Sequence, residues 1–340
     1  MNIRDRTSVE VQRIRAIGLT VTDADRAGDF YTQALSFKPV SDNTFEGEGY
    51  SDLEGVAPTK IRVVTLQLGD EFIQLMQYLD LEEKPIPQDS QSNDLWFQHM
   101  AIAVSDMERA YAHLQLFPIE PISVEPQTIP SDNEASAGVR AFKFKDLDRH
   151  NLELIWFPPD KGQSKWHQNS DRLFLGIDHS AIAVANTEQS VQFYCNLLGM
   201  QIESRSLNWH ATQSRLDDLP EAKVRITDLR PTQGGLGIEL LDYIAPANGR
   251  PMPSDWRSCD VARVQIELVV NNIQQAVDLL RQNGVRFVSS RLVQFTDSAS
   301  PYYQGCLLED PDGHAMLLIS ARSSGHYSCS IARSSGGKSS

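Results

Sequence analysis

The sequence lacks the features of membrane and exported proteins. No apolar run approaches the roughly 18 residues that a transmembrane helix needs. The polar segment at residues 1–12 contains no apolar stretch of the kind found in signal peptides. The cysteines, Cys195, Cys259, Cys306 and Cys329, are scattered and form no Cys-x-x-Cys pair, which argues against a thiolate zinc site or a disulfide framework. These absences predict a cytoplasmic protein with reduced thiols and no membrane partner.

Positive charge is also scarce. The chain has 31 lysines and arginines against 45 aspartates and glutamates, so its formal net charge is −14. An acidic surface repels the phosphates of nucleic acids and anionic lipids. We therefore expect no nucleic-acid partner, whereas the charge places no constraint on a small-molecule substrate.

An internal repeat is the strongest positive signal. Residues 84–104 (KPIPQDSQSNDLWFQHMAIAV) align with residues 250–270 (RPMPSDWRSCDVARVQIELVV), with two prolines, two aspartates and a serine in register. Residues 53–65 align in the same way with residues 216–228. A register held over so many positions indicates a duplicated domain.

A finer repeat divides each half into two β-α-β-β-β modules. Each module opens with a strand of alternating apolar residues and a helix that starts near a polar capping residue, namely Asp23, Ser105, Asn186 or Asn271. The predicted fold is therefore α+β, with an N-terminal domain at 13–157 (modules 13–80 and 97–157) and a C-terminal domain at 173–320 (modules 175–245 and 261–320). We predict a linker at 158–172 and a disordered Ser- and Gly-rich tail at 321–340.

Three motifs resemble those of the vicinal oxygen chelate superfamily, which includes glyoxalase I, extradiol dioxygenases and bleomycin resistance proteins. They are HMAIAVSDMERAYAHL (99–114), HSAIAVANTEQSVQFYCNLLGM (179–200) and DPDGHAMLLI (310–319). The resemblance implies that paired modules form two cup-shaped mixed β-sheets with helices on the outside. It also implies a divalent metal in the cup, held by one residue on the first strand and one on the last strand of each module.

Carried over position by position, the resemblance gives four ligand positions in each half. They are Ala16, Gln74, His99 and Glu153 in the first half, and His179, Glu239, Gln265 and Leu317 in the second. Neither half has the two histidines and one carboxylate that non-haem iron oxygenases usually show. We expect at most one cup to be active, and we favour the C-terminal one.

Strand alternation gives an independent test of these positions. Side chains two apart share a face, so His99 and His179 would each lie beside two alanines, with large aliphatic residues on the opposite face. Glu267 would share the face of Gln265 and add a carboxylate to the C-terminal cup. Imidazole, carboxylate and amide ligands suit Fe(II), Mn(II), Ni(II), Co(II) or Zn(II).

Two functions are favoured by these residues. The first is a metal-dependent lyase or isomerase of glyoxalase type, or a dioxygenase, acting on a small substrate with adjacent oxygens, with Glu239, Glu267 or Glu153 moving a proton. The second is a metal-free protein that sequesters a small molecule, as bleomycin resistance proteins do. A scaffold without chemistry would not need His and Glu at the cup positions. We expect the chain to work as a monomer or a homodimer.

Overall fold

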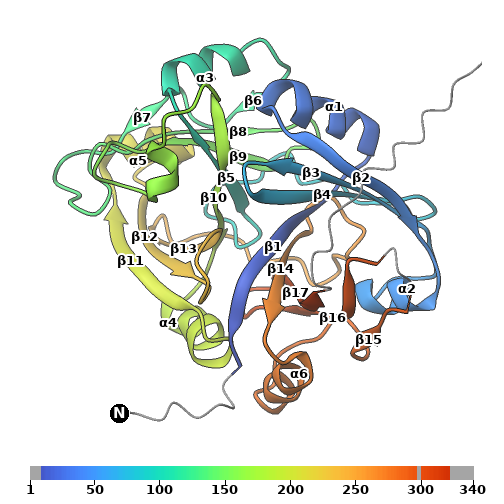
Figure 1. The fold of residues 1–340 in the computed structure, drawn as a ribbon. Helices are drawn as coiled ribbons and strands as arrows, with labels where there is room; N and C mark the ends of the chain where they lie inside the picture. The colour runs from blue at the N-terminus through green and yellow to red at the C-terminus, as the bar shows by residue number, and fades with distance from the viewer. Residues whose placement is uncertain (1–8, 297–299, 322–340) are drawn as a thin grey trace, which may run out of the picture.

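The computed structural model describes residues 9–296 and 300–321 (Figure 1). It contains four β-α-β-β-β modules arranged in two mixed β-sheets, which confirms the predicted α+β fold. The predicted disordered tail lies outside the described residues, apart from Ala321 at the end of the last strand. Within the described part of the chain, no helix is long and apolar enough to cross a membrane.

The first and fourth modules form one sheet, called sheet A here. Its strand order is β15-β16-β17-β14-β1-β4-β3-β2. At its centre, β1 pairs antiparallel with β14, with Gly18 opposite Gln265. The strands are β1 (Val11–Thr20), β2 (Lys38–Phe45), β3 (Ile61–Leu68), β4 (Glu71–Tyr78), β14 (Val264–Val270), β15 (Val293–Gln294), β16 (Tyr302–Glu309) and β17 (Ala315–Ala321).

The second and third modules form the other sheet, called sheet B. Its order is β11-β12-β13-β10-β5-β9-β8-β6, and β7 also pairs with β8. The antiparallel pair β5·β10 lies at its centre. The strands are β5 (Gln98–Val104), β6 (Glu120–Pro121), β7 (Gln127–Thr128), β8 (Arg140–Lys145), β9 (Asn151–Trp156), β10 (Phe174–Ala183), β11 (Gln201–Asn208), β12 (Lys223–Arg230) and β13 (Gly237–Ala245).

The expectation that each half of the chain folds into its own cup is therefore wrong. Each half contributes one module to each sheet, because β1 pairs with β14 rather than with β5. Segment 158–172, predicted to be a linker, includes a short 3-10 helix at Ser164–His167. That helix buries Trp166 on the concave face of sheet B.

The helices follow the predicted capping chemistry. Asp23 and Asn186 cap their helices as predicted, and the other two caps are each one residue later, at Asp106 and Asn272. The helices are α1 (Ala24–Leu35), α2 (Glu48–Glu54), α3 (Met107–Leu114), α4 (Thr187–Val191), which continues as a π-helical turn (Gln192–Leu197), α5 (His210–Asp217) and α6 (Ile273–Gln282). In Figure 1, α5 lies over sheet B and α2 lies beside β15 and β16 of sheet A.

One large core joins the two sheets. It contains aliphatic residues from the first strands of all four modules, such as Ile102, Ile182 and Ile266, together with the buried faces of α1, α3 and α6. The alternate residues of the same strands, including Ala101 and Ala181, belong to separate clusters on the opposite face. The predicted division of each strand into a core face and a cup face is thus confirmed. We call the concave faces of the two sheets cup A and cup B.

Candidate metal centre

Four polar residues meet in cup B, one from each of its central strands. His99 lies on β5, Glu153 on β9, His179 on β10 and Glu239 on β13. We call these four residues the His/Glu cluster. The register explains their meeting, since Ala101 lies between Glu153 and His179 across three adjacent strands. In the same way, Ala181 lies between His99 and Glu239.

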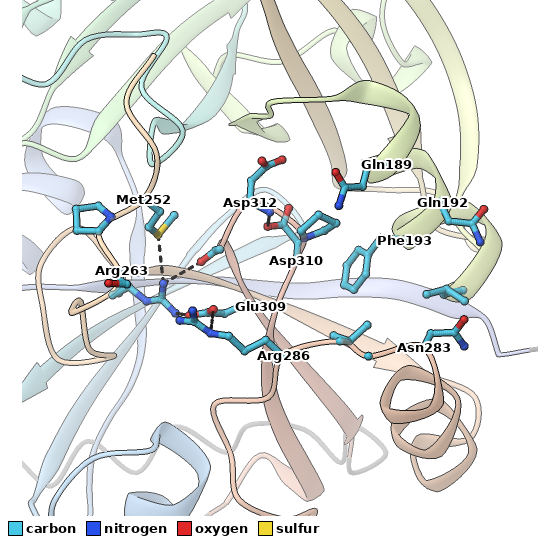
Figure 2. A pocket seen from close by; sticks show the side chains of 17 residues that line it. Gln189, Gln192, Phe193, Met252, Arg263, Asn283, Arg286, Glu309, Asp310 and Asp312 are labelled. Atoms are coloured by element: carbon cyan, nitrogen blue, oxygen red, sulfur yellow. Dashed lines mark hydrogen bonds and ion pairs between the residues drawn. The ribbon is translucent and has the colours of Figure 1, made fainter. Parts of the chain in front are cut away.

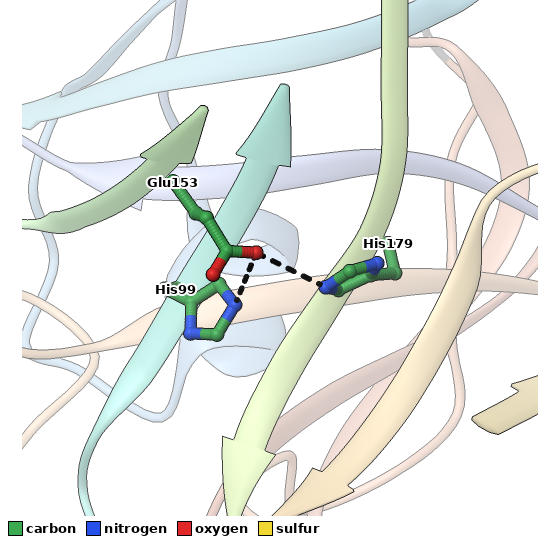
Figure 3. A group of neighbouring side chains, drawn as sticks. All are labelled: His99, Glu153 and His179. Carbon is green, nitrogen blue, oxygen red and sulfur yellow. Dashed lines mark ion pairs between the residues drawn. The ribbon is translucent and has the colours of Figure 1, made fainter. Parts of the chain in front are cut away.

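The side chains of the cluster converge on a small volume. Figure 3 shows both imidazoles turned toward the same oxygen of Glu153. The Oε2 atom of Glu153 lies 3.4 Å from Nε2 of His99 and 3.8 Å from Nε2 of His179. Nε2 of His179 also lies 3.4 Å from Oε2 of Glu239. Three members of the His/Glu cluster, His99, Glu153 and His179, offer donor atoms that all lie within 4.8 Å of one another.

These distances leave polar atoms unsatisfied. Within the described residues, both ring nitrogens of His99 and Nε2 of His179 are buried and have no hydrogen-bond partner. The separations of 3.4 Å and more exceed the usual length of a hydrogen bond. A buried group without a partner costs about 1–3 kcal/mol. Imidazole nitrogens and carboxylate oxygens together form a donor set that a divalent transition metal would satisfy.

Asp178 fixes the orientation of His179. Its Oδ2 lies 3.0 Å from Nδ1 of His179 and accepts a hydrogen bond from Arg230, also at 3.0 Å. Its other oxygen accepts from Trp166 Nε1 at 2.7 Å. Because an ionised carboxylate only accepts, Nδ1 of His179 carries the proton and Nε2 is directed into the cluster.

The charges in the cluster are set by burial and by its neighbours. Burial lowers the pKa of His99 to about 4, so its imidazole is neutral near pH 7. Burial would raise the pKa of Glu153, but His99 and Lys143 lower it to about 2. Glu153 is therefore ionised near pH 7, as a carboxylate ligand must be.

Burial and neighbouring charges also shift the pKa values of His179 and Glu239. Burial would lower the pKa of His179, but Glu239 and Asp178 raise it to about 9. Burial and the nearby carboxylates of Asp228 and Glu153 raise the pKa of Glu239 to about 7, against the attraction of His179. Near neutral pH the imidazole of His179 is protonated, and a metal would have to displace that proton.

The remaining predicted site residues lie in cup A. Gln74 on β4, and Gln265 and Glu267 on β14, belong to sheet A and not to the sheet of the His/Glu cluster. The two predicted ligand sets, Gln74 with His99 and Glu153, and Gln265 with His179 and Glu239, are therefore wrong as sets. The physical reason is the exchange of modules between the halves, which brings all four predicted His and Glu ligands into cup B.

Cup A is filled by polar side chains that satisfy one another. Glu267 is fully buried and forms an ion pair with Arg15. With its amide oriented to suit both neighbours, Gln74 donates to Glu267 at 2.7 Å and accepts from Arg15 at 3.1 Å. Gln265 donates to the sulfur of Met76 at 3.0 Å. The other two predicted ligand positions of cup A hold the apolar residues Ala16 and Leu317. None of the four predicted ligand positions in cup A therefore holds a histidine.

A cavity of about 70 Å³ adjoins the His/Glu cluster. All four members of the cluster line it, and α5 closes it through Gln213 and Leu216. Its walls are about half aliphatic and half polar, and Lys143 and Tyr243 are among the polar residues. The cavity is small, so with α5 in this position the site suits a compact ligand.

A larger cavity of about 420 Å³ lies outside both cups (Figure 2). It is bounded by Phe193 of the α4 segment, by the loop after α6 and by the hairpin that carries Asp310 and Gly313. In the first half of the chain, Arg149 occupies the position of Gly313 and pairs with Glu120. Gly313 is one of the residues that line this cavity, and none of the His/Glu cluster does.

Comparisons with known proteins agree with this architecture. The sequence profile of the Glyoxalase/Bleomycin resistance protein/Dioxygenase superfamily matches residues 13–154 and 176–318. A lactoylglutathione lyase of Salmonella typhimurium is 27% identical over 155 residues, which cover 43% of this chain and 93% of the lyase. A 2-epi-5-epi-valiolone epimerase of an Actinomyces species is 26% identical over 120 residues, which cover 33% of this chain but only 61% of the epimerase.

Two solved structures share the fold over nearly the whole chain. Glyoxalase I from Zea mays superimposes with a TM-score of 0.59 at 15% identity, covering 91% of this chain and 92% of that protein. A putative dioxygenase from Bacillus subtilis gives a TM-score of 0.54 at 11% identity, covering 92% and 86%. At such identities the likeness establishes the fold, and the chemistry must be argued from the site.

Proposed function

Because this chain belongs to the Glyoxalase/Bleomycin resistance protein/Dioxygenase superfamily, we propose that it is a metal-dependent lyase or isomerase that acts in cup B. The observation that carries the proposal is the convergence of two buried imidazoles and two carboxylates from four strands. When bound there, a divalent metal would act as a Lewis acid on a substrate with two adjacent oxygens.

The two glutamates of the cluster differ in the work they can do. Glu153 has a pKa of about 2 and remains an anion, which suits a permanent ligand. Glu239 has a pKa of about 7, and its side chain is 21% exposed, so it can accept and return a proton near neutral pH. We therefore assign proton transfer to Glu239. Glu267 has no part in this site, since it lies in cup A in an ion pair with Arg15.

A dioxygenase is the second candidate. His99, His179 and Glu153 together make the two-histidine, one-carboxylate set that non-haem iron oxygenases use, although neither half of the chain contains it alone. Glu239 beside His179 favours the lyase or isomerase, because it supplies a fourth ligand or a base. The curated relatives, named as a lyase and an epimerase, support the same choice.

The metal content of the purified protein tests the proposal. We expect one equivalent of divalent metal per chain. Cup B contains all four residues of the His/Glu cluster, whereas no predicted ligand position of cup A holds a histidine. Elemental analysis after anaerobic purification would measure it, followed by assays for proton exchange and oxygen uptake on small substrates with two adjacent oxygens, with each candidate metal. Metal-free protein that cannot be loaded would favour the sequestration hypothesis, and two equivalents would contradict a single site.

Metal affinity should depend steeply on pH. Since a metal displaces the proton of His179, whose pKa is about 9, the apparent affinity should fall about tenfold for each pH unit below 9. Below pH 7 the fall should steepen toward a hundredfold per unit, because Glu239 is then protonated as well. Titrations in metal buffers between pH 6 and 8.5 would measure this slope. A constant affinity over that range would contradict the proposed ligands, and Glu239→Gln should remove the added steepness below pH 7.

A further inference from the structure

Lys143 is a buried cation beside the His/Glu cluster. It lies on β8 directly opposite Glu153 on β9, so both side chains project from the concave face of sheet B. The lysine is only 3% exposed and lines the cavity next to the cluster. Among the described residues that line this cavity, it is the sole lysine or arginine. A buried lysine is rare unless it is paired.

The partner of Lys143 is a carboxylate on the helix that closes the cavity. Its Nζ donates a hydrogen bond to Oδ1 of Asp217, the last residue of α5, at 2.7 Å. Asp217 also accepts from Tyr243 at 2.9 Å and from Gln213 at 2.6 Å. The carboxylate is thus well satisfied by three donors, two of which do not depend on the lysine.

The ammonium of Lys143, by contrast, has unused capacity. It carries three N–H donors, and within the described residues it makes one hydrogen bond, to Asp217, and lies 5.6 Å from the ring centroid of Phe97. Paired with the carboxylate of Asp217, the lysine side chain keeps its ordinary positive charge at neutral pH. A cation with free donors at the wall of a small cavity is suited to an anionic group of a ligand.

This cation is peculiar to one of the four modules. The residues opposite the corresponding last-strand positions are Thr65 in the first module, Asp228 in the third and Leu307 in the fourth. The fold itself therefore does not require a lysine at this position. The lysine occurs where the cavity and the His/Glu cluster lie together.

We propose that Lys143 determines specificity by binding a carboxylate of the substrate, so that the substrate is a small organic acid whose two adjacent oxygens face the His/Glu cluster. The inference rests on the proposed metal-dependent function. Asp217 holds the ammonium in place before the substrate arrives.

Two 2-hydroxy acids test this inference. Lactate and tartronate present the same hydroxyl and carboxylate to the cluster, but tartronate has a second carboxylate where lactate has a methyl group. Calorimetric titration of the metal-loaded protein would give both dissociation constants. We expect wild type to prefer tartronate, and the double variant Lys143→Met/Asp217→Asn to lose about ten- to hundredfold of that preference, as expected for a charge-assisted hydrogen bond.

The double variant avoids leaving one buried charge without its partner, which alone would destabilise the fold. Its metal content shows whether the site is intact. The single variant Lys143→Arg provides a second test, since it keeps a cation that can pair with Asp217 and should therefore keep the preference for tartronate. An equal preference in wild type and the double variant would overturn the role of Lys143. Failure of both acids to bind metal-loaded wild type would also overturn this inference, whereas protein that takes up no metal would instead contradict the proposed metal-dependent function.

Discussion

Replacing His99 or His179 with alanine should abolish stoichiometric metal binding and, with it, turnover. Each variant removes one of two imidazoles that converge on Glu153 in a buried site. Changing a residue that merely orients a ligand typically costs 10- to 100-fold in metal affinity, so loss of a ligand should exceed about a hundredfold. Elemental analysis and competition with a chelator would measure the loss.

The internal duplication provides matched controls for this experiment. Gln74 and Gln265 occupy the corresponding ligand positions of cup A, and Gln74→Met and Gln265→Met preserve side-chain volume. Both variants should keep one equivalent of metal, since sheet A contributes nothing to the His/Glu cluster. Loss of metal in these variants together with retention in His99→Ala would locate the centre in cup A and contradict the proposal.

Much of the fold could be predicted because its signals are local. Alternation along each strand predicted that Ile102 and Ile182 face the core while Ala101 and Ala181 face the cup, and the core clusters agree. The helix starts were correct to within one residue, because a polar cap satisfies free backbone N–H groups at a defined position. All four residues of the cluster were among the predicted ligands.

The pairing of modules could not be predicted, because the same alternation occurs in all four. The first strand of any module can pair antiparallel with that of any other module without burying a polar face. The alternation therefore does not predict whether β1 pairs with β5 or with β14. The choice depends on long-range packing, in which the two sheets share one core. Assigning partners by order in the sequence therefore divided one ligand set into two incomplete sets.

Two supporting residues were missed for different reasons. Asp178 directly precedes His179, so strict alternation puts it on the opposite face, but an irregularity in the β5·β10 register between Ile177 and His179 changes that alternation. Lys143 did carry a signal, since it alternates with Phe142 and Phe144, which are fully buried in the core. An alternation test applied to the third strand of that module would have put a lysine in the cup.

Cup A should contribute stability rather than chemistry, and Glu267→Ala tests this. The variant leaves Arg15, whose side chain is only 11% exposed, without its main carboxylate partner. It also removes an acceptor from Gln74 and from Tyr302, whose hydroxyl lies 3.5 Å away. Breaking a buried ion pair in this way typically costs about 3–5 kcal/mol, which is a large share of the stability of a folded protein.

Denaturant unfolding of wild type and Glu267→Ala at equal metal loading would measure this loss. The double variant Arg15→Met/Glu267→Met should recover most of the free energy of unfolding, because replacing both members of a buried pair by apolar groups of similar volume is often neutral. All three proteins should retain one equivalent of metal and unchanged turnover, since cup A and the His/Glu cluster belong to different sheets. A fall in turnover at full metal occupancy would show that cup A influences the chemistry. A loss of less than about 1 kcal/mol in the free energy of unfolding of Glu267→Ala would show that solvent stabilises the charge of Arg15 in place of Glu267.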